Sequence, residues 1–304
     1  NFQGSFEKIN FIAPAAGSYF QLSGFQPNVE QGKFDDNLKL FVKNGKMQIV
    51  NNIDLENYIA GVVEAEVGRL PPIEYLKLQA IICRTYALGN MQKHYADGYN
   101  LCSEVHCQAY NGKTHYKDIL SAVYKTKDIV VVDSDISLIT AVFHSSCGGQ
   151  TVNSEDVWSN QVYYLRSVED SFCIKGKNAH WEKTIDAKKW EEYLQKELAV
   201  NRISSQFYAQ KEDGRKVYFM ESSSLRMKKI REDWNLRSAY FTAEKSGDKV
   251  LLKGKGYGHG VGLCQIGAME MARRKYTYAE ILHHYYRGVH LVSLTALDFF
   301  RDKP

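Results

Sequence analysis

Short apolar runs broken by turn residues alternate with helical apolar stripes along this chain, so the pattern predicts strands and helices together. The clearest strand signal is the stretch LKLFVKNGKMQIV, which covers residues 38–50. It holds two apolar runs around Asn44-Gly45, and a tight hairpin turn favours this pair because both central residues need a positive φ. We therefore predict a β-hairpin over this segment.

Two helices are predicted next. Asp54 can cap a helix from Leu55 to about Val67, and Gly68 follows as its end signal. After a break at Pro71-Pro72, a second helix is predicted from about Ile73 to His94. The apolar stripe of the second helix consists of Ile73, Leu76, Ala80, Cys83, Ala87 and Met91.

The rest of the chain mixes both kinds of element. Hairpins are predicted over residues 121–143, with a turn near 133–135, and over residues 240–253, and a helix is predicted from Asp186 to about Ala199. Two closing helices are expected at about 268–275 and 278–286. Because no strand–helix–strand rhythm is present, the class is α+β, with mixed helices and antiparallel hairpins.

The length of 304 residues allows one large domain or two ordinary ones. We predict an N-terminal extension over residues 1–37, a core built from 38–180 and 238–304, and an inserted variable region over 181–237. The net charge of +4 is mild, and no dense Lys/Arg block is present, so a nucleic-acid partner is not expected. No apolar run is long enough to span a membrane. The first residues, Asn1 to Gly4, do not look like a natural start, so we expect an export signal or anchor to be missing.

The stretch IAGVVEAEVG contains two glutamates at the end of the first predicted helix. Counted from Leu55, Glu66 is about 20° from the apolar stripe and Glu64 about 180° from it. Glu64 is therefore expected to face water and Glu66 to continue the buried face. Burial raises a carboxyl pKa, as a general acid requires. The alternative is a structural Glu66 that pairs with an arginine such as Arg69 or Arg84.

A glycine-dense loop precedes the closing helices, in the stretch GKGYGHGVGLCQIGA. It is not a phosphate loop because no Gly-Lys-Ser/Thr follows. Alternate glycines allow a close approach of the backbone to a ligand. His259 could donate to such a ligand, and Gln265 opens a helix. A tight turn with a structural histidine is the alternative.

The six cysteines fall into local groups. Cys102, His106 and Cys107 lie within six residues of one another, with His94 shortly before them. Two thiolates and one or two imidazoles fit a tetrahedral zinc site, but a local disulfide or idle thiols would also satisfy the spacing. Cys147 and Cys264 each lie in a glycine-rich turn. Together with Cys173 they leave open a disulfide, a second metal site or buried free thiols.

Three separated motifs occur in one order: VVEAEVGRLPPIEYLKLQAIICRTYAL, FHSSCGGQTVNSEDVW and GKGYGHGVGLCQIGAMEMA. In this order and spacing they resemble the family of stage II sporulation protein D and the amidase enhancer. The similarity covers roughly residues 38–172 and 238–292. It departs from the family pattern at Val67-Gly68, where many relatives carry Met-Pro.

The resemblance implies an extracytoplasmic lytic transglycosylase that cleaves peptidoglycan glycan strands, preferring strands without stem peptides, with Glu66 as the catalytic residue. It also implies a structural zinc at Cys102, His106 and Cys107, with His94 as the fourth candidate ligand. Two lobes would form a groove for the glycan. The expected substrate contacts are Arg84, Ser145, Ser146, Gly149, His259 and Gln265. The alternative is a non-catalytic peptidoglycan-binding module or an enhancer of a cell-wall amidase, which would be its partner.

Overall fold

The computed structural model describes residues 4–15, 17–22, 32–68, 71–176, 178–208 and 214–296. Helices and small, mostly antiparallel sheets are mixed along the chain, which confirms the predicted α+β class. The chain divides into two compact units, one formed by 1–141 with 290–304 and the other by 142–289. These limits do not coincide with the predicted domain boundaries. Each unit is described below by itself.

Unit 1 begins with antiparallel strands. The predicted hairpin is confirmed as β4 (Asn37–Lys43) paired with β5 (Lys46–Asn52). Its turn residues Asn44 and Gly45 have φ values of 51° and 71°. The predicted N-terminal extension contributes β1 (Lys8–Phe11), which pairs with β4. A second small sheet contains β2 (Tyr19–Leu22) and β3 (Gly32–Asp35).

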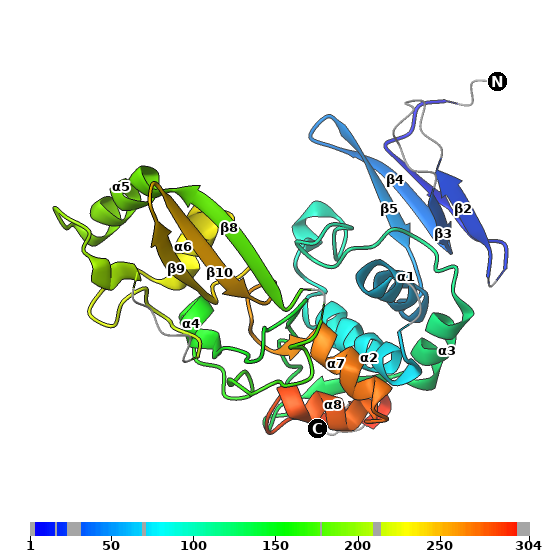
Figure 1. Ribbon diagram of the computed structural model, residues 1–304. Coiled ribbons are helices and arrows are strands. Elements are labelled where there is room, and N and C mark those ends of the chain that lie inside the picture. Colours follow the sequence, from blue (N-terminus) through cyan, green and yellow to red (C-terminus); the bar gives the residue numbers. More distant parts are fainter. Residues whose placement is uncertain are drawn as a thin grey trace. The chain divides into compact units, whose positions relative to one another are not determined.

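The helices of unit 1 pack together around a buried apolar cluster (Figure 1). Helix α1 (Leu55–Val67) has the predicted bounds, and the Asp54 side chain accepts hydrogen bonds from two backbone N–H groups of its first turn. Helix α2 (Ile73–Gly89) ends five residues before the predicted end at His94, because the Asn90 N–H bonds back to the Ala87 carbonyl and closes a turn. Two further helical elements of unit 1 are η1 (Tyr95–Asp97) and α3 (Lys117–Lys125).

The predicted hairpin over residues 121–143 is confirmed only around its turn, where the Asp133 N–H bonds the Ser137 carbonyl and the Ile139 N–H bonds the Val131 carbonyl. Its first residues belong to α3, and β6 (Ile129–Val132) pairs with β12 (His290–Ser293) from the far end of the chain. A single bridge joins Val132 to Leu138, after which the second arm leaves the strand. The buried valines of β6 gain a longer partner in β12, so a distant contact overrides the local pattern.

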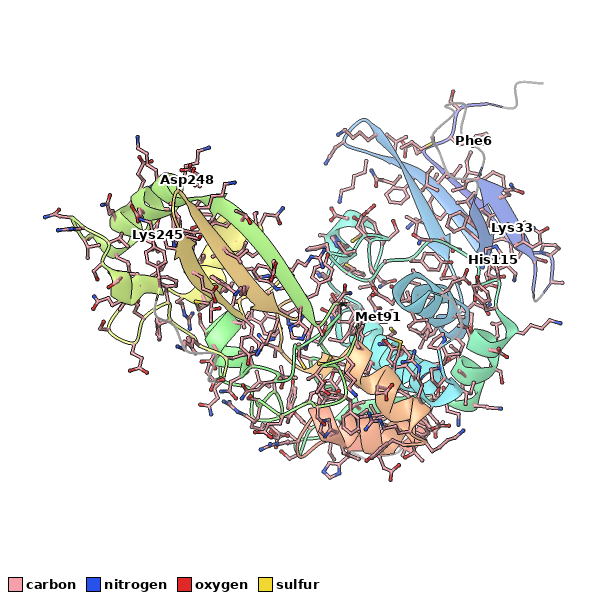
Figure 2. The ribbon with its side chains drawn as sticks, in the orientation of Figure 1. Phe6, Lys33, Met91, His115, Lys245 and Asp248 are labelled. Atoms are coloured by element: carbon pink, nitrogen blue, oxygen red, sulfur yellow. The ribbon has the colours of Figure 1, made fainter. Side chains whose placement is uncertain are left out.

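Unit 2 contains a sheet in the order β8–β10–β9, built from β8 (His180–Asp186), β10 (Lys249–Lys255) and β9 (Phe241–Ser246). The predicted hairpin β9–β10 is confirmed, and Figure 2 labels Lys245 and Asp248 near its turn. Helix α5 (Ala187–Leu198) begins at the predicted cap Asp186. Together with α6 (Met227–Asp233) and η2 (Ser205–Tyr208), the sheet forms one apolar core. Strands β9 and β10 therefore complete the core of the region predicted as an insertion.

The rest of unit 2 carries the cysteine-bearing and glycine-rich turns. Strand β7 (Phe143–His144) pairs in parallel with β11 (Leu263–Cys264). Helices α7 (Gln265–Arg273) and α8 (Tyr278–Tyr285) confirm the predicted closing pair, and α4 (Ser154–Trp158) is a short additional helix. Among the described residues, no helix has the length and hydropathy needed to cross a membrane.

Candidate functional site

Glu66 lies in the last turn of α1 and is half-buried. Burial raises the pKa of Glu66, and a hydrogen bond from the Ala109 backbone opposes this shift only in part. The thiol of Cys83 on α2 is close enough that the Glu66 charge, after burial itself, helps to raise the Cys83 pKa. The pKa of Glu66 is therefore shifted in the direction that a general acid requires.

Glu64, two residues earlier, has a different environment. Its two carboxylate oxygens bond the backbone N–H and the ring Nδ1 of His115, at 2.7 and 3.1 Å. Burial alone would raise the pKa of Glu64, but hydrogen bonds from Thr114 and His115 outweigh it, so the pKa lies below its usual range. Glu64 is thus half-buried and bonded, not turned to water as predicted. Figure 2 labels His115 near α1.

A cavity of about 270 Å³ opens beside Glu64. It is lined by Gly61, Glu64, Ala65 and Gly68 of the α1 region and by residues of the 111–116 segment. Glu66 is not among its lining residues. The two glutamates therefore differ in the direction of their pKa shifts and in their surroundings, and each serves as a control for the other.

Arg84 occupies the core of unit 1 and not a binding surface. Its guanidinium bonds both carboxylate oxygens of Glu56, at 2.9 and 2.5 Å, and the backbone carbonyls of Ile129 and Val123. No surface of Arg84 is exposed. A sugar has no access to it, so the expected substrate contact of Arg84 is wrong. The alternative pairing of Glu66 with Arg84 is also wrong, because Arg84 binds Glu56, and Arg69 lies outside the described residues.

The segment that follows Cys107 carries the groups around Glu66. The Ala109 backbone donates to the Glu66 carboxylate, and the buried Gln108 accepts from the Tyr58 hydroxyl at 3.4 Å. The Gln108 amide nitrogen has no hydrogen-bond partner among the described residues. The Gln108 side chain is buried and lies against the Cys83 thiol, whose pKa it lowers in opposition to burial.

Gly61 allows α1 to approach the same segment. A Cβ at this position would lie 2.3 Å from the Gly112 carbonyl oxygen and 2.5 Å from the Tyr110 ring. Such distances are too short for any side chain, so only glycine allows this packing. The sequence of α1 thereby fixes the distance between Glu66 and the residues that surround it.

The structure brings together His94, Cys102, His106 and Cys107. Their ligand atoms all lie within 4.8 Å of one another. His106 Nδ1 lies 3.8 Å from the Cys102 sulfur and 3.9 Å from the Cys107 sulfur. In a tetrahedral zinc site with sulfur and nitrogen ligands, neighbouring ligand atoms are roughly 3.5–3.8 Å apart, so a small adjustment suffices. All six cysteines are free thiols in this structure.

His94 fits as the fourth ligand. Its Nε2 is buried and has no hydrogen-bond partner among the described residues, while its Nδ1 lies 3.4 Å from the Asp97 carboxylate. A carboxylate on the far ring nitrogen is the usual support of a metal-binding histidine. These four residues could therefore hold a metal ion.

In unit 2, His259 is bonded within its own loop. Nδ1 accepts from the Val261 N–H at 3.1 Å, so the ring proton is on Nε2, which donates to the Phe143 carbonyl at 2.9 Å. Burial lowers the pKa of His259 to about 4, so the ring is neutral. With both nitrogens engaged, the expected donation from His259 to a ligand is not available in this structure, and the ring contacts those of His144 and Trp158.

The other expected contacts of unit 2 lie beside cysteines. Ser145, Ser146 and Gly149 flank Cys147, and Gln265 follows Cys264. Ser145 accepts from the Asn178 amide at 3.2 Å. The Gln265 amide nitrogen is buried without a partner among the described residues, so it remains a candidate donor.

The sequence alone did not reveal three contributors. Ala109 acts through its backbone, which has no signal in a sequence. His115 was not recognised because nothing in the spacing connects it with Glu64. Asp170 lies with Cys147, Cys173 and Cys264, and their ligand atoms are all within 4.8 Å of one another. Asp170 lies three residues before Cys173 in the sequence, and this spacing could have identified it as a further candidate ligand.

Comparison with known proteins agrees with these motifs. The family described as "Stage II sporulation protein" matches residues 43–132. Stage II sporulation protein D of Bacillus subtilis is 30% identical over 84% of this chain and 78% of its own length. An uncharacterised protein of Brachyspira hyodysenteriae is 31% identical over 84% of this chain and 71% of its own. The amidase enhancer of Bacillus subtilis is 27% identical over 77% of this chain and 40% of its own.

These similarities identify the protein family. With this identity and coverage, the chain belongs to the family of stage II sporulation protein D, to which the amidase enhancer is also similar.

Proposed function

We propose that this protein acts on the bacterial cell wall, outside the cytoplasm, as a lytic transglycosylase of peptidoglycan glycan strands. One observation carries the proposal: Glu66 is half-buried with a raised pKa, while Glu64 is bonded to His115 with a lowered pKa. Two neighbouring carboxyl groups whose environments push their pKa values apart are typical of an acid/base site. Family membership adds support.

In this mechanism Glu66 acts twice. As an acid it protonates the glycosidic oxygen between N-acetylmuramic acid and N-acetylglucosamine, and the bond to C1 breaks with positive charge developing on the ring. The resulting carboxylate then accepts the proton of the muramic 6-hydroxyl, whose oxygen attacks C1 and closes a 1,6-anhydro ring. The proton returns Glu66 to its starting state, and no water is consumed.

One carboxyl group is enough for this reaction. A hydrolase usually requires a second carboxyl group at a defined separation, as nucleophile or as base for water. Glu64 is poorly suited to that role, because both of its oxygens are occupied by His115. The Ala109 N–H stabilises Glu66 in its charged form between the two steps.

We propose that the metal held by His94, Cys102, His106 and Cys107 is zinc with a structural role. A site with four protein ligands is closed, so bound zinc would contribute folding free energy and no open coordination position. Bound zinc would affect catalysis by fixing the positions of residues near Glu66. Cys107 is followed directly by Gln108 and Ala109, so fixing Cys107 fixes the two residues that surround Glu66.

Ser145, Gly149 and Gln265 are proposed as glycan contacts of unit 2, whereas the expected contact of Ser146 is excluded because this residue is buried beside Cys173. The groove implied by the family resemblance remains a prediction. A second candidate function is support of a cell-wall amidase without cleavage, and the similarity to an amidase enhancer favours it.

Product chemistry separates these functions. Purified glycan strands, with and without stem peptides, are incubated with the protein, and the products are identified by mass spectrometry. Anhydromuramic ends support a transglycosylase, and a faster reaction on stripped strands supports the substrate preference. Reducing ends indicate hydrolysis and contradict the mechanism. Strand binding without any cleavage would favour the enhancer function.

A further inference from the structure

We propose that unit 2 contains a second structural zinc site, formed by Cys147, Cys173, Cys264 and Asp170. The four residues come from three separated stretches of the sequence, and all are fully buried. Their ligand atoms all lie within 4.8 Å of one another. Three sulfurs and one carboxylate oxygen match the ligand types and the number that zinc takes in tetrahedral sites.

The sulfur spacing favours one metal ion. The Cys147 and Cys173 sulfurs are 3.3 Å apart, well beyond the length of a disulfide bond, and all three thiols are free. Thiolates on one tetrahedral zinc are about 3.8 Å apart, so binding needs only a slight widening. An iron–sulfur cluster would place its sulfurs farther apart, since each thiolate then binds a different iron.

The ligands are held by donors that surround them. The Cys264 sulfur accepts from the backbone N–H groups of Cys147 and Gly267, at 3.3 and 3.4 Å. The Asp170 carboxylate accepts from the Phe172 N–H and from the buried Tyr285 hydroxyl, each at 2.9 Å. Such donors orient metal ligands from the second layer.

Backbone packing is also adapted to the cluster. A Cβ at Gly267 would lie 2.2 Å from an Asp170 carboxylate oxygen and 2.3 Å from the Tyr285 hydroxyl. Gly148, next to Cys147, has a φ of 72° and lies against the backbone of Gly256. Glycine at both positions allows the turn and the first turn of α7 to approach the carboxylate closely.

A divalent cation also resolves an electrostatic problem. No described ion pair neutralises Asp170, although its side chain has no access to solvent. A buried carboxylate is stable when it is paired or binds a metal. Arg215 donates to the Cys147 carbonyl at 2.6 Å and adds positive charge beside the cluster.

The proposed site would position the residues around it. Cys147 is preceded by Ser146 and followed closely by Gly149, and Cys264 is followed by Gln265. Zinc would hold these two turns against each other through bonds to both cysteines. This consequence rests on the proposed glycan-binding function, whereas the metal content does not.

The test uses the full-length chain purified under reducing conditions without added chelator, and measures zinc per chain by elemental analysis. We expect two zinc ions in the wild type. The variant Cys102→Ser/Cys107→Ser, which lacks the thiolates of the first cluster, should retain one. Exchange of that ion for cobalt(II) should give strong thiolate-to-cobalt absorption. Adding Cys173→Ser to this double variant should abolish the thiolate-to-cobalt absorption. Adding Cys83→Ala instead should leave the absorption unchanged, because Cys83 is a buried thiol outside both clusters and serves as the control.

Three results would overturn the proposal. The first is a single zinc ion in the wild type and none in the double variant. The second is a disulfide-linked peptide joining Cys147 to Cys173 after digestion without reductant. The third is unchanged cobalt absorption after Cys173→Ser. If the double variant fails to fold, the wild-type zinc content still decides, and Asp170→Asn, which keeps every sulfur, should alter the cobalt spectrum.

Discussion

At the residue scale, the neighbours of a carboxyl group determine what it can do. Glu64 and Glu66 have the same side chain and lie on one helix, yet their pKa values shift in opposite directions. For Glu66 the cause is burial, and for Glu64 it is the set of hydrogen bonds from Thr114 and His115. The helical periodicity predicted the burial of Glu66, although it placed Glu64 too far into solvent.

The opposite shifts predict opposite effects on stability. The raised folded-state pKa of Glu66 means that its stabilising contribution is complete below the unfolded pKa and is lost as the pH rises through the folded pKa. At neutral pH, Glu66→Gln should therefore raise the free energy of unfolding, because the neutral amide avoids the cost of a buried charge. Below the ordinary glutamate range the two proteins should be equally stable.

Glu64→Gln is the matched control. The lowered pKa of Glu64 makes its contribution present above the unfolded pKa and lost as the pH falls through the folded pKa. The variant should lose about 0.5–1 kcal/mol at neutral pH, since His115 is exposed and the bond is screened by solvent. Urea unfolding at several pH values measures both. The same sign for both variants at neutral pH would contradict the assignment.

At the element scale, α1 acts as the support of the site. It carries both glutamates, and Gly61 brings it against the segment that contains Gln108 and Ala109. The bounds of this helix were predictable because Asp54 and Gly68 mark its ends locally. The end of α2 and the partner of β6 were not, because a local turn and a strand from the far end of the chain determine them.

Gly61→Ala tests this support. The added Cβ would collide with the Gly112 carbonyl and the Tyr110 ring, so α1 must move and the protein should lose about 1–3 kcal/mol. Cleavage should fall as well, because Ala109 would no longer meet Glu66. Gly89→Ala is the control: its Cβ would meet only Leu138 at 3.9 Å, and stability should be unchanged or slightly higher. If Gly61→Ala and Gly89→Ala changed the denaturation midpoint and the cleavage rate by the same amounts, the account would be contradicted.

The sequence predicted which residues lie together better than it predicted long-range contacts. Close spacing placed Cys102, His106 and Cys107 in one cluster, because residues near in sequence are near in space. Arg84 was misassigned because its partner Glu56 is 28 residues away in the sequence, and only the packing of α1 on α2 joins them. His259 was misassigned because its backbone partners, Phe143 and Val261, have no sequence signal.

At the scale of the whole molecule, each unit contains its own cluster of ligand atoms. His94, Cys102, His106 and Cys107 belong to unit 1, and Cys147, Asp170, Cys173 and Cys264 belong to unit 2. In both cases the cluster lies beside residues proposed to meet the glycan. Metal binding would therefore stabilise each unit and order its functional segment at the same time.

Removal of metal from the first cluster should affect stability and activity together. In Cys102→Ser/Cys107→Ser the melting temperature should fall by several degrees, and cleavage should decrease at least tenfold, because Gln108 and Ala109 lose their anchor. Added zinc should not restore either property, although it should restore both in chelator-treated wild type. A double variant with the stability and activity of the wild type would contradict the structural role of the first cluster.

The most direct measurement is the initial rate at which anhydromuramic ends form from stripped glycan strands, compared between the wild type, Glu66→Gln and Glu64→Gln. We predict that Glu66→Gln lowers the rate by at least about 10³-fold while strand binding is retained, since the amide can neither give nor take the proton. Glu64→Gln should keep the rate within about tenfold of the wild type. Cleavage that survives Glu66→Gln, or that is lost in Glu64→Gln instead, would contradict the assignment of Glu66 as the acid and base.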